Sequence, residues 1–158
     1  MTRRILMPTV GRFVRYYDLF TNTSAFAQDV PVALWTRPDL SQQTDADVTP
    51  SATTPGYFVR SETVQGALAF GSVYAGVDPP VAMTRQVSAD LTTVEATTTL
   101  QLAPGQSVAL LHYVLLRAPD SAGQAVTDAD ALATLTDPDV FLGLSQTDLG
   151  LIVNFRVP

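Results

Sequence analysis

Short apolar runs, separated by turn-forming residues, follow one another along most of this chain. Within Val94–Leu102, the apolar residues Leu100 and Leu102 alternate with polar residues. This period of two is typical of a strand with one buried and one exposed face. The next run, Ser107–Arg117, is apolar at nearly every position, which predicts a strand covered on both faces, as at the centre of a sandwich. Residues 103–106 (Ala-Pro-Gly-Gln) between the two runs have the composition of a tight turn.

Further apolar runs predict more strands, each ended by turn formers such as Pro, Gly, Asn, Asp or Ser. The expected strands cover residues 5–20, 30–35, 57–59, 67–77, 81–87 and 153–157. One long segment, residues 38–56, contains Pro, Ser, Thr, Gln, Asp and Gly with almost no large apolar residue. Because this segment has little to bury, we expect a long surface loop there.

The C-terminal part of the chain has a different pattern. Residues 123–136 are rich in Ala and Asp, and their apolar residues approximate a helical stripe that Thr127 or Asp128 would cap. Ser145 followed by Asp148 indicates a second, short helix with a weakened capping box. We therefore expect a single all-β domain over residues 1–158. It would be an antiparallel β-sandwich of about seven to nine strands with one or two short helices near the C-terminus.

Composition excludes several classes of function. The 158-residue chain has a net charge of −6 and no cysteine, so disulfides, thiolate metal sites and cysteine nucleophiles are excluded. All nine basic residues are arginines, and their scattered positions give no basic stripe for a nucleic acid. Charged residues make up only 15% of the chain, below the typical value of about 25%. Such a surface suits contact with a neighbouring domain or with a second copy of the chain; the alternative is a solvent-exposed β surface covered by Thr, Ser and Gln.

Residues suited to catalysis are sparse. His112 is the only histidine, it lies in the most apolar run, and no nucleophile motif accompanies it. A lone histidine in such a run is usually a core or interface residue. Acid pairs such as Asp128 with Asp130 and Asp137 with Asp139 fit helix caps and turns better than a calcium site, which needs about six to eight oxygen ligands. We expect no catalytic residue, no metal and no cofactor.

Aromatic side chains are the remaining candidates for a binding site. We select Trp35, Tyr57 and Tyr74 as possible stacking platforms, because exposed aromatic rings stack on sugar rings or anchor interfaces. Core packing is the competing interpretation for each of these three residues.

Four parts of the sequence together resemble β-sandwich domains in exported and surface proteins of GC-rich bacteria. They are the strand end FTNT at 20–23, VYAGVDP at 73–79, LAPGQSVALLHY at 102–113, and the closing LGLS at 142–145 with IVNF at 152–155. The resemblance implies an exported, multidomain context and no catalytic residues. The N-terminal residues depart from that expectation, because their apolar stretch is too short for a signal peptide.

These observations favour a non-catalytic structural or adhesive module of an extracellular or cell-surface assembly. Its expected partners are copies of itself or neighbouring domains. The alternative is a carbohydrate-binding module that uses exposed aromatic residues to bind glycans. An enzyme or an accessory domain of one is the third hypothesis. No apolar run approaches the roughly 20 residues that a membrane-spanning helix needs, so we expect no membrane span.

Overall fold

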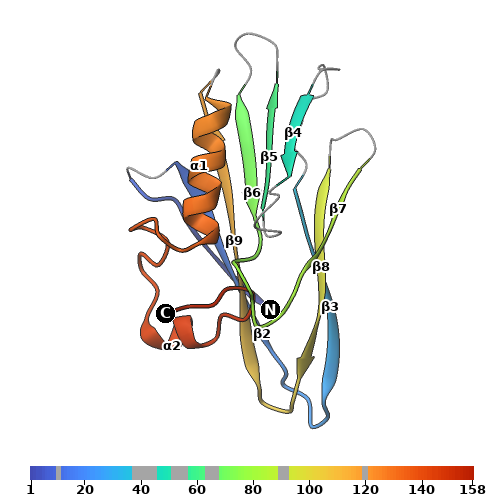
Figure 1. Cartoon of the computed structure of the whole chain (residues 1–158). Coiled ribbons are helices and arrows are strands. Elements are labelled where there is room, and N and C mark those ends of the chain that lie inside the picture. The colour runs from blue at the N-terminus through green and yellow to red at the C-terminus, as the bar shows by residue number, and fades with distance from the viewer. Residues whose placement is uncertain (10–11, 37–45, 51–56, 63–67, 89–92, 119–120) are drawn as a thin grey trace.

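The protein folds into two antiparallel sheets with two short helices near the C-terminus (Figure 1). The computed structural model describes residues 1–9, 12–36, 46–50, 57–62, 68–88, 93–118 and 121–158. This architecture confirms the predicted all-β sandwich-like fold with its helices near the C-terminus. No helix in these described ranges is long and apolar enough to span a membrane.

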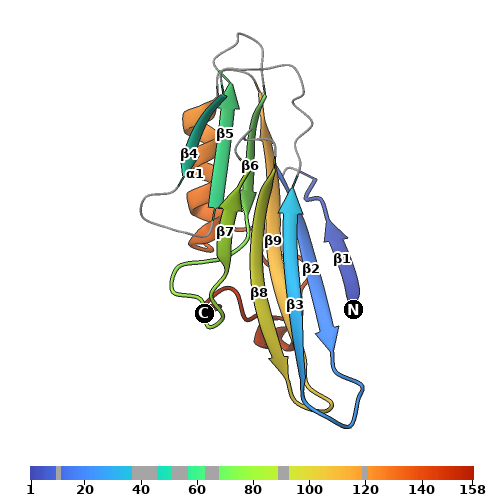
Figure 2. The same ribbon diagram turned by 90° about the vertical axis from the view of Figure 1, so that its right-hand side faces the viewer.

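The larger sheet has six strands, and every neighbouring pair in it is antiparallel. In spatial order they are β1 (Thr2–Leu6), β2 (Phe13–Thr21), β9 (Ser107–Arg117), β6 (Ala69–Val73), β5 (Tyr57–Glu62) and β4 (Ala46–Pro50). The smaller sheet has three strands, in the order β3 (Gln28–Thr36), β8 (Val94–Leu102) and β7 (Thr84–Val87). The smaller sheet lies against one face of the larger one (Figure 2).

Strand β9 lies inside the larger sheet and is covered on both of its faces, as its apolar composition predicts. On one face, Leu111, Tyr113 and Leu115 pack in a core with helix α1 (Ala122–Ala133) and the C-terminal segment. On the other face, Leu110 packs against the smaller sheet. The chain therefore forms three layers, which are the smaller sheet, the larger sheet and helix α1. Helix α1 packs on the larger sheet over β5, β6 and β9 (Figure 1).

The turn between β8 and β9 has the geometry that its sequence predicts. Gly105 has a φ of +74°, and the N–H of Gln106 donates to the carbonyl of Ala103 at 3.0 Å. Glycine adopts this left-handed conformation without a steric cost. The turn carries the chain from β8 in one sheet to β9 in the other.

The predicted strand at 153–157 is wrong. After helix α2 (Gln146–Gly150) the chain makes only an isolated parallel bridge, between Ile152 and Ala109 of β9. Asn154 then bonds β9 through its side chain instead of its backbone. The capping box of α2 is confirmed, because the Ser145 hydroxyl accepts from the Asp148 N–H and the Asp148 carboxylate accepts from the Ser145 N–H.

Three other expectations need correction. The run 5–20 forms two strands, β1 and β2, since Pro8 lacks the N–H needed to continue a ladder. Part of the expected loop at 38–56 is strand β4, whose backbone pairs with β5 and whose one large apolar residue is Val48; residues 37–45 and 51–56 lie outside the described residues. Helix α1 begins earlier than expected, after Ser121, so Thr127 and Asp128 lie inside it and cap nothing.

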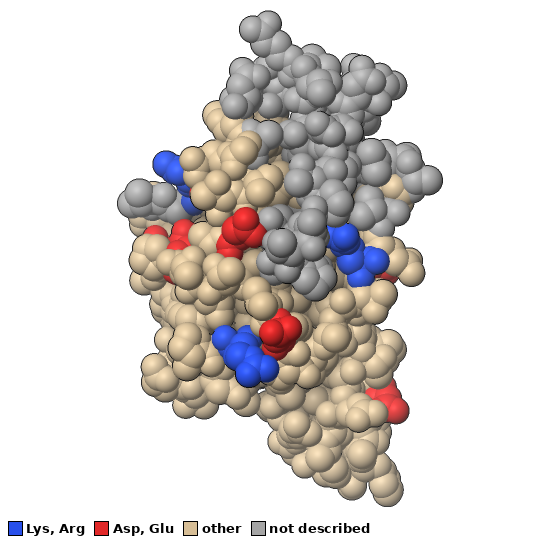
Figure 3. All heavy atoms as spheres, in the orientation of Figure 1, with Lys and Arg blue, Asp and Glu red and all other residues tan. Residues whose placement is uncertain are grey.

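The smaller sheet does not reach across the whole width of the larger one. Strand β3 is an edge strand, and β1 lies beyond it at the edge of the larger sheet (Figure 2). Pro31 lies within β3, where a residue without an N–H is tolerated only if that position faces the free edge. Much of the surface in the orientation of Figure 1 carries no charge (Figure 3), in agreement with the low charge content.

Candidate functional site

Trp35 projects from the outer face of the smaller sheet. Exposure alternates along β3, where Pro31, Ala33 and Trp35 are exposed and the residues between them are partly buried. The alternate residues Val32 and Leu34 pack on the inter-sheet core. With 66% of its surface exposed, Trp35 presents its indole ring to solvent.

Two polar residues lie in a row with Trp35 across this face. Trp35 is the direct partner of Glu95 on β8, and Glu95 is the direct partner of Gln86 on β7. Direct partners in antiparallel strands point to the same face, with their Cβ atoms about 4.5–5.5 Å apart. The row therefore places an aromatic ring, a carboxylate and an amide side by side on one sheet surface.

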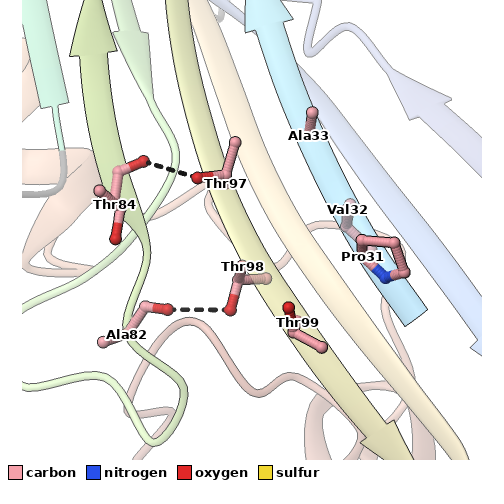
Figure 4. Close-up of a pocket in the computed structure, with 8 residues that line it drawn as sticks. All are labelled: Pro31, Val32, Ala33, Ala82, Thr84, Thr97, Thr98 and Thr99. Carbon is pink, nitrogen blue, oxygen red and sulfur yellow. Dashed lines mark hydrogen bonds between the residues drawn. The ribbon is translucent and has the colours of Figure 1, made fainter. Parts of the chain in front are cut away.

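A shallow hollow of about 480 Å³ adjoins this row (Figure 4). Three strands supply its lining, with Pro31 and Ala33 from β3 and Thr97 and Thr99 from β8 among them. The Thr97 hydroxyl donates to the carbonyl of Thr84 at 3.4 Å. We call this feature the threonine hollow. It extends the polar surface beside Trp35 with threonine hydroxyls.

On the other side of β3 lies a cleft of about 300 Å³ between the two sheets. Its lining includes Trp35 and Thr36 of β3, Arg3 of β1, Tyr16 of β2 and His112 of β9. We call it the β3 cleft. Trp35 therefore lies at a strand that has a polar face on one side and an aromatic cleft on the other.

The floor of the β3 cleft consists of two stacked aromatic rings and an arginine–aspartate ion pair. The rings of Tyr16 and His112 stack with centroids 4.6 Å apart and an interplanar angle of 4°. The Arg3 guanidinium lies over the Tyr16 ring and donates from Nε and Nη2 to the two carboxylate oxygens of Asp18, at 2.6 and 2.8 Å. Asp18 is fully buried, so the bidentate pair neutralises its charge under the cleft.

The His112 side chain is largely buried beneath the cleft. Burial, opposed by Asp18, lowers the pKa of His112 from 6.5 to about 4. Its Nδ1 lies 3.8 Å from the Asp18 carboxylate, beyond hydrogen-bond reach, and has no hydrogen-bond partner among the described residues. The largely buried position of His112 agrees with the expected core or interface residue, but its Nδ1 is left without a hydrogen bond to these residues. The carboxylate near His112 belongs to Asp18, which Arg3 already holds.

The acid pairs considered as metal ligands serve other purposes. The Asp139 N–H donates to the Asp137 carboxylate at 2.9 Å, which is the turn role expected for that pair. Asp128 accepts from the Arg117 guanidinium. Within the described residues, no group of three or more His, Asp or Glu side chains could hold a metal ion.

Tyr74, another of the selected aromatic residues, does not join Trp35. Tyr74 is only 2% exposed and packs with Phe70 between the sheets, so its ring face is closed to a ligand, and core packing is the correct interpretation for it. Its burial raises the pKa of its hydroxyl. Tyr57 begins β5, and its side chain lies outside the described residues.

Glu95, Gln86 and Tyr16 were not selected from the sequence. The period of two along Val94–Leu102 places Glu95 on the exposed face of its strand, but it does not say which residue lies beside it. Only the pairing of β3 with β8, and of β8 with β7, brings Glu95 and Gln86 into a row with Trp35. Tyr16 reaches the β3 cleft from the larger sheet.

No family model matches the chain, and no curated protein matches it. Among solved structures, the fold is similar to part of a protein described as "Putative kojibiose phosphorylase from human microbiome". The superposition has a TM-score of 0.54 and 12% sequence identity, and it covers 87% of this chain. This chain spans only 18% of that much longer protein. The similarity shows that this arrangement of two sheets also occurs as a small part of a larger chain.

Proposed function

We propose that this chain is a non-catalytic carbohydrate-binding module of a larger protein, in which a sugar ring stacks on Trp35. The observation that carries the proposal is the row of Trp35, Glu95 and Gln86 on an exposed sheet face. The C–H face of a pyranose packs on an indole ring. Its hydroxyls donate to a carboxylate and exchange hydrogen bonds with an amide or with threonine hydroxyls.

The context of the fold supports a module over a whole enzyme. The similar structure uses this fold for 18% of its length, and its description names a sugar, kojibiose. In the β3 cleft, the carboxylate nearest to the His112 ring is that of Asp18, 3.8 Å from Nδ1, and it is already bound to Arg3. We place the module in an extracellular or cell-surface assembly, as the sequence resemblance implies.

A glycan microarray probed with the full chain is the first test. We expect binding to at least one class of glycan, and a loss of about tenfold or more in affinity for Trp35→Ala. Phe26→Ala is the matched control, because Phe26 is also an aromatic residue and is 76% exposed, but it lies before β3 and away from the row. Array binding that survives Trp35→Ala, or an array without any hit, would contradict the proposal.

Intrinsic fluorescence gives a second readout at the site itself. Trp35 is the only tryptophan, so a shift of its emission on adding the glycan reports contact at this residue and nowhere else. Glu95→Gln keeps the shape of the side chain but removes the charge, and it should weaken binding less than Trp35→Ala. A glycan that binds without changing the emission would place the site elsewhere.

Packing against a neighbouring domain is the second candidate, and β1 supplies the observation that favours it. Ile5 is the direct partner of Tyr16 and so lies on the face of the larger sheet that carries the smaller sheet, but beyond the edge of the smaller sheet, where it is 61% exposed. Met1 and Met7, which flank β1, are also exposed. Light scattering on the purified chain tests self-association by this edge. A monomer at high concentration would count against a second copy as the partner.

A further inference from the structure

A second cavity lies on the opposite face of the larger sheet, away from Trp35. It has a volume of about 270 Å³, near the lower limit for small-molecule pockets, which is about 300 Å³. The ends of β2 and β9 form one wall, with Arg12 and Arg117, and α1 and the loop after it form the other. Phe13, Leu115 and Leu132 supply its apolar lining. We call it the α1 pocket.

Arg117 is held rigidly in this pocket and has one nitrogen to spare. Its side chain is only 10% exposed, and its Nε donates to the Asp128 carboxylate. The other carboxylate oxygen of Asp128 accepts from Gln124 at 3.2 Å. The Arg117 Nη2 is buried and has no hydrogen-bond partner in the part of the chain that the structure describes. Buried donors are nearly always paired, so an unpaired guanidinium N–H beside a cavity indicates that an acceptor from outside these residues completes it.

The other charged side chains of the α1 pocket lie on two facing walls, with the arginine on one wall and the aspartates on the other. Arg12 on the strand side is exposed and makes no side-chain hydrogen bond or ion pair with another described residue. On the helix side, Asp137 and Asp139 follow α1, and only Asp137 uses a carboxylate oxygen in the turn. One wall thus offers guanidinium donors, and the facing wall offers carboxylate acceptors.

We propose that the α1 pocket binds a small zwitterion, an α-amino acid with an apolar side chain. The ligand carboxylate would accept from Arg117 Nη2 and from Arg12, which form charge-assisted hydrogen bonds with planar oxyanions. The ammonium would donate to Asp137 and Asp139. The side chain would lie on the apolar lining. A simple anion fits less well, because the pocket carries three carboxylates against two guanidinium groups.

Chemical-shift titration of the full-length ¹⁵N-labelled chain at pH 7 tests this site with four probes. They are L-leucine, N-acetyl-L-leucine without the ammonium, L-leucinamide without the carboxylate, and neutral glucose. We expect L-leucine to shift the amides of residues 115–117 and 137–139, and the two blocked forms to bind at least tenfold more weakly. No shift with L-leucine, or equal binding of a blocked form, overturns the proposal. Shifts with glucose alone would assign the pocket to a polyol and also overturn it.

Two variants localise the binding. Arg12→Gln should weaken L-leucine binding about tenfold without loss of stability, since Arg12 is exposed. Arg117→Lys keeps a charge beside Asp128 but lacks the second donor nitrogen, and it should also weaken binding. Arg156→Gln is the control, because Arg156 is an exposed arginine outside this pocket. Unchanged affinity in Arg12→Gln overturns the proposal even if Arg117→Lys fails to fold.

Discussion

Asn154 takes the place of a neighbouring strand for Leu111. The Leu111 N–H donates to the Asn154 side-chain oxygen at 2.9 Å, and the Asn154 Nδ2 donates back to the Leu111 carbonyl at 2.7 Å. The same Nδ2 donates to the carbonyl of Tyr74 at 2.7 Å. Asn154 has no exposed surface. One amide side chain therefore fastens the C-terminal segment to β9 and to the end of β6.

Replacing Asn154 with alanine should destabilise the protein strongly. The change leaves one buried N–H and two buried carbonyls without this partner, at a cost of about 1–3 kcal/mol for each unsatisfied group, although the carbonyls keep some capacity elsewhere. We expect a loss of about 3 kcal/mol in the free energy of unfolding, measured by urea denaturation. Gln101→Ala, on the exposed face of β8, is the control and should change little. A loss below about 1 kcal/mol for Asn154→Ala would show that the segment is held by other contacts.

Gly71 on β6 lies directly beside the Leu115 side chain on the neighbouring strand β9. A Cβ atom at this position would lie 2.7 Å from Cγ of Leu115, a fully buried residue. Gly71→Ala should therefore lower the free energy of unfolding by about 1–3 kcal/mol through overpacking. Gly123→Ala is the matched comparison, because a Cβ there meets no atom within 4 Å and alanine favours a helix. We expect Gly123→Ala to be neutral or stabilising by up to about 1 kcal/mol in the same thermal or urea unfolding experiment. Equal effects of the two changes would contradict the close packing of β6 on β9.

Local sequence patterns predicted most of the strands, but they did not predict which strands or side chains lie next to one another. Val94–Leu102 and Ser107–Arg117 have the predicted bounds, because alternation in one and continuous apolar residues in the other depend only on which faces are covered. Strand β4 was missed, since its sequence has a single large apolar residue, Val48, and backbone pairing to β5 holds it at the edge of the sheet. The strand expected at 153–157 was wrong because a side chain, that of Asn154, replaces the backbone ladder there.

The candidate site shows the same division. Trp35, selected as a possible stacking platform, has an exposed ring, whereas Tyr74, selected on similar strand-like surroundings in sequence, is buried. The difference comes from the packing of the two sheets. Tyr74 lies between them, whereas Trp35 lies on the outer face of the smaller sheet. The row of Trp35, Glu95 and Gln86 consists of residues that are far apart in sequence. The same is true of the two walls of the α1 pocket, which contain Arg117 and Asp137. Such pairs depend on strand order and register, which single-sequence patterns do not contain.

His112 should make the stability of the protein depend on pH above the range where carboxylates titrate. Burial holds the pKa of folded His112 at about 4, against 6.5 for an unperturbed histidine. Between these values the unfolded chain binds a proton that the folded chain does not, so stability is complete above pH 6.5 and is lost as the pH falls toward 4. The loss amounts to at most about 3 kcal/mol, and it should level off below pH 4. His112 is the only histidine, so no other histidine contributes in the window from pH 6.5 to 5.

Urea unfolding of the wild type and of His112→Phe at several pH values is the measurement. Phenylalanine keeps a ring against Tyr16 but cannot titrate, so the variant should lose the slope between pH 6.5 and 5. A slope that persists in His112→Phe would assign it to another group. A wild type without the slope would mean that Asp18, 3.8 Å from Nδ1, holds a protonated His112 in the folded protein.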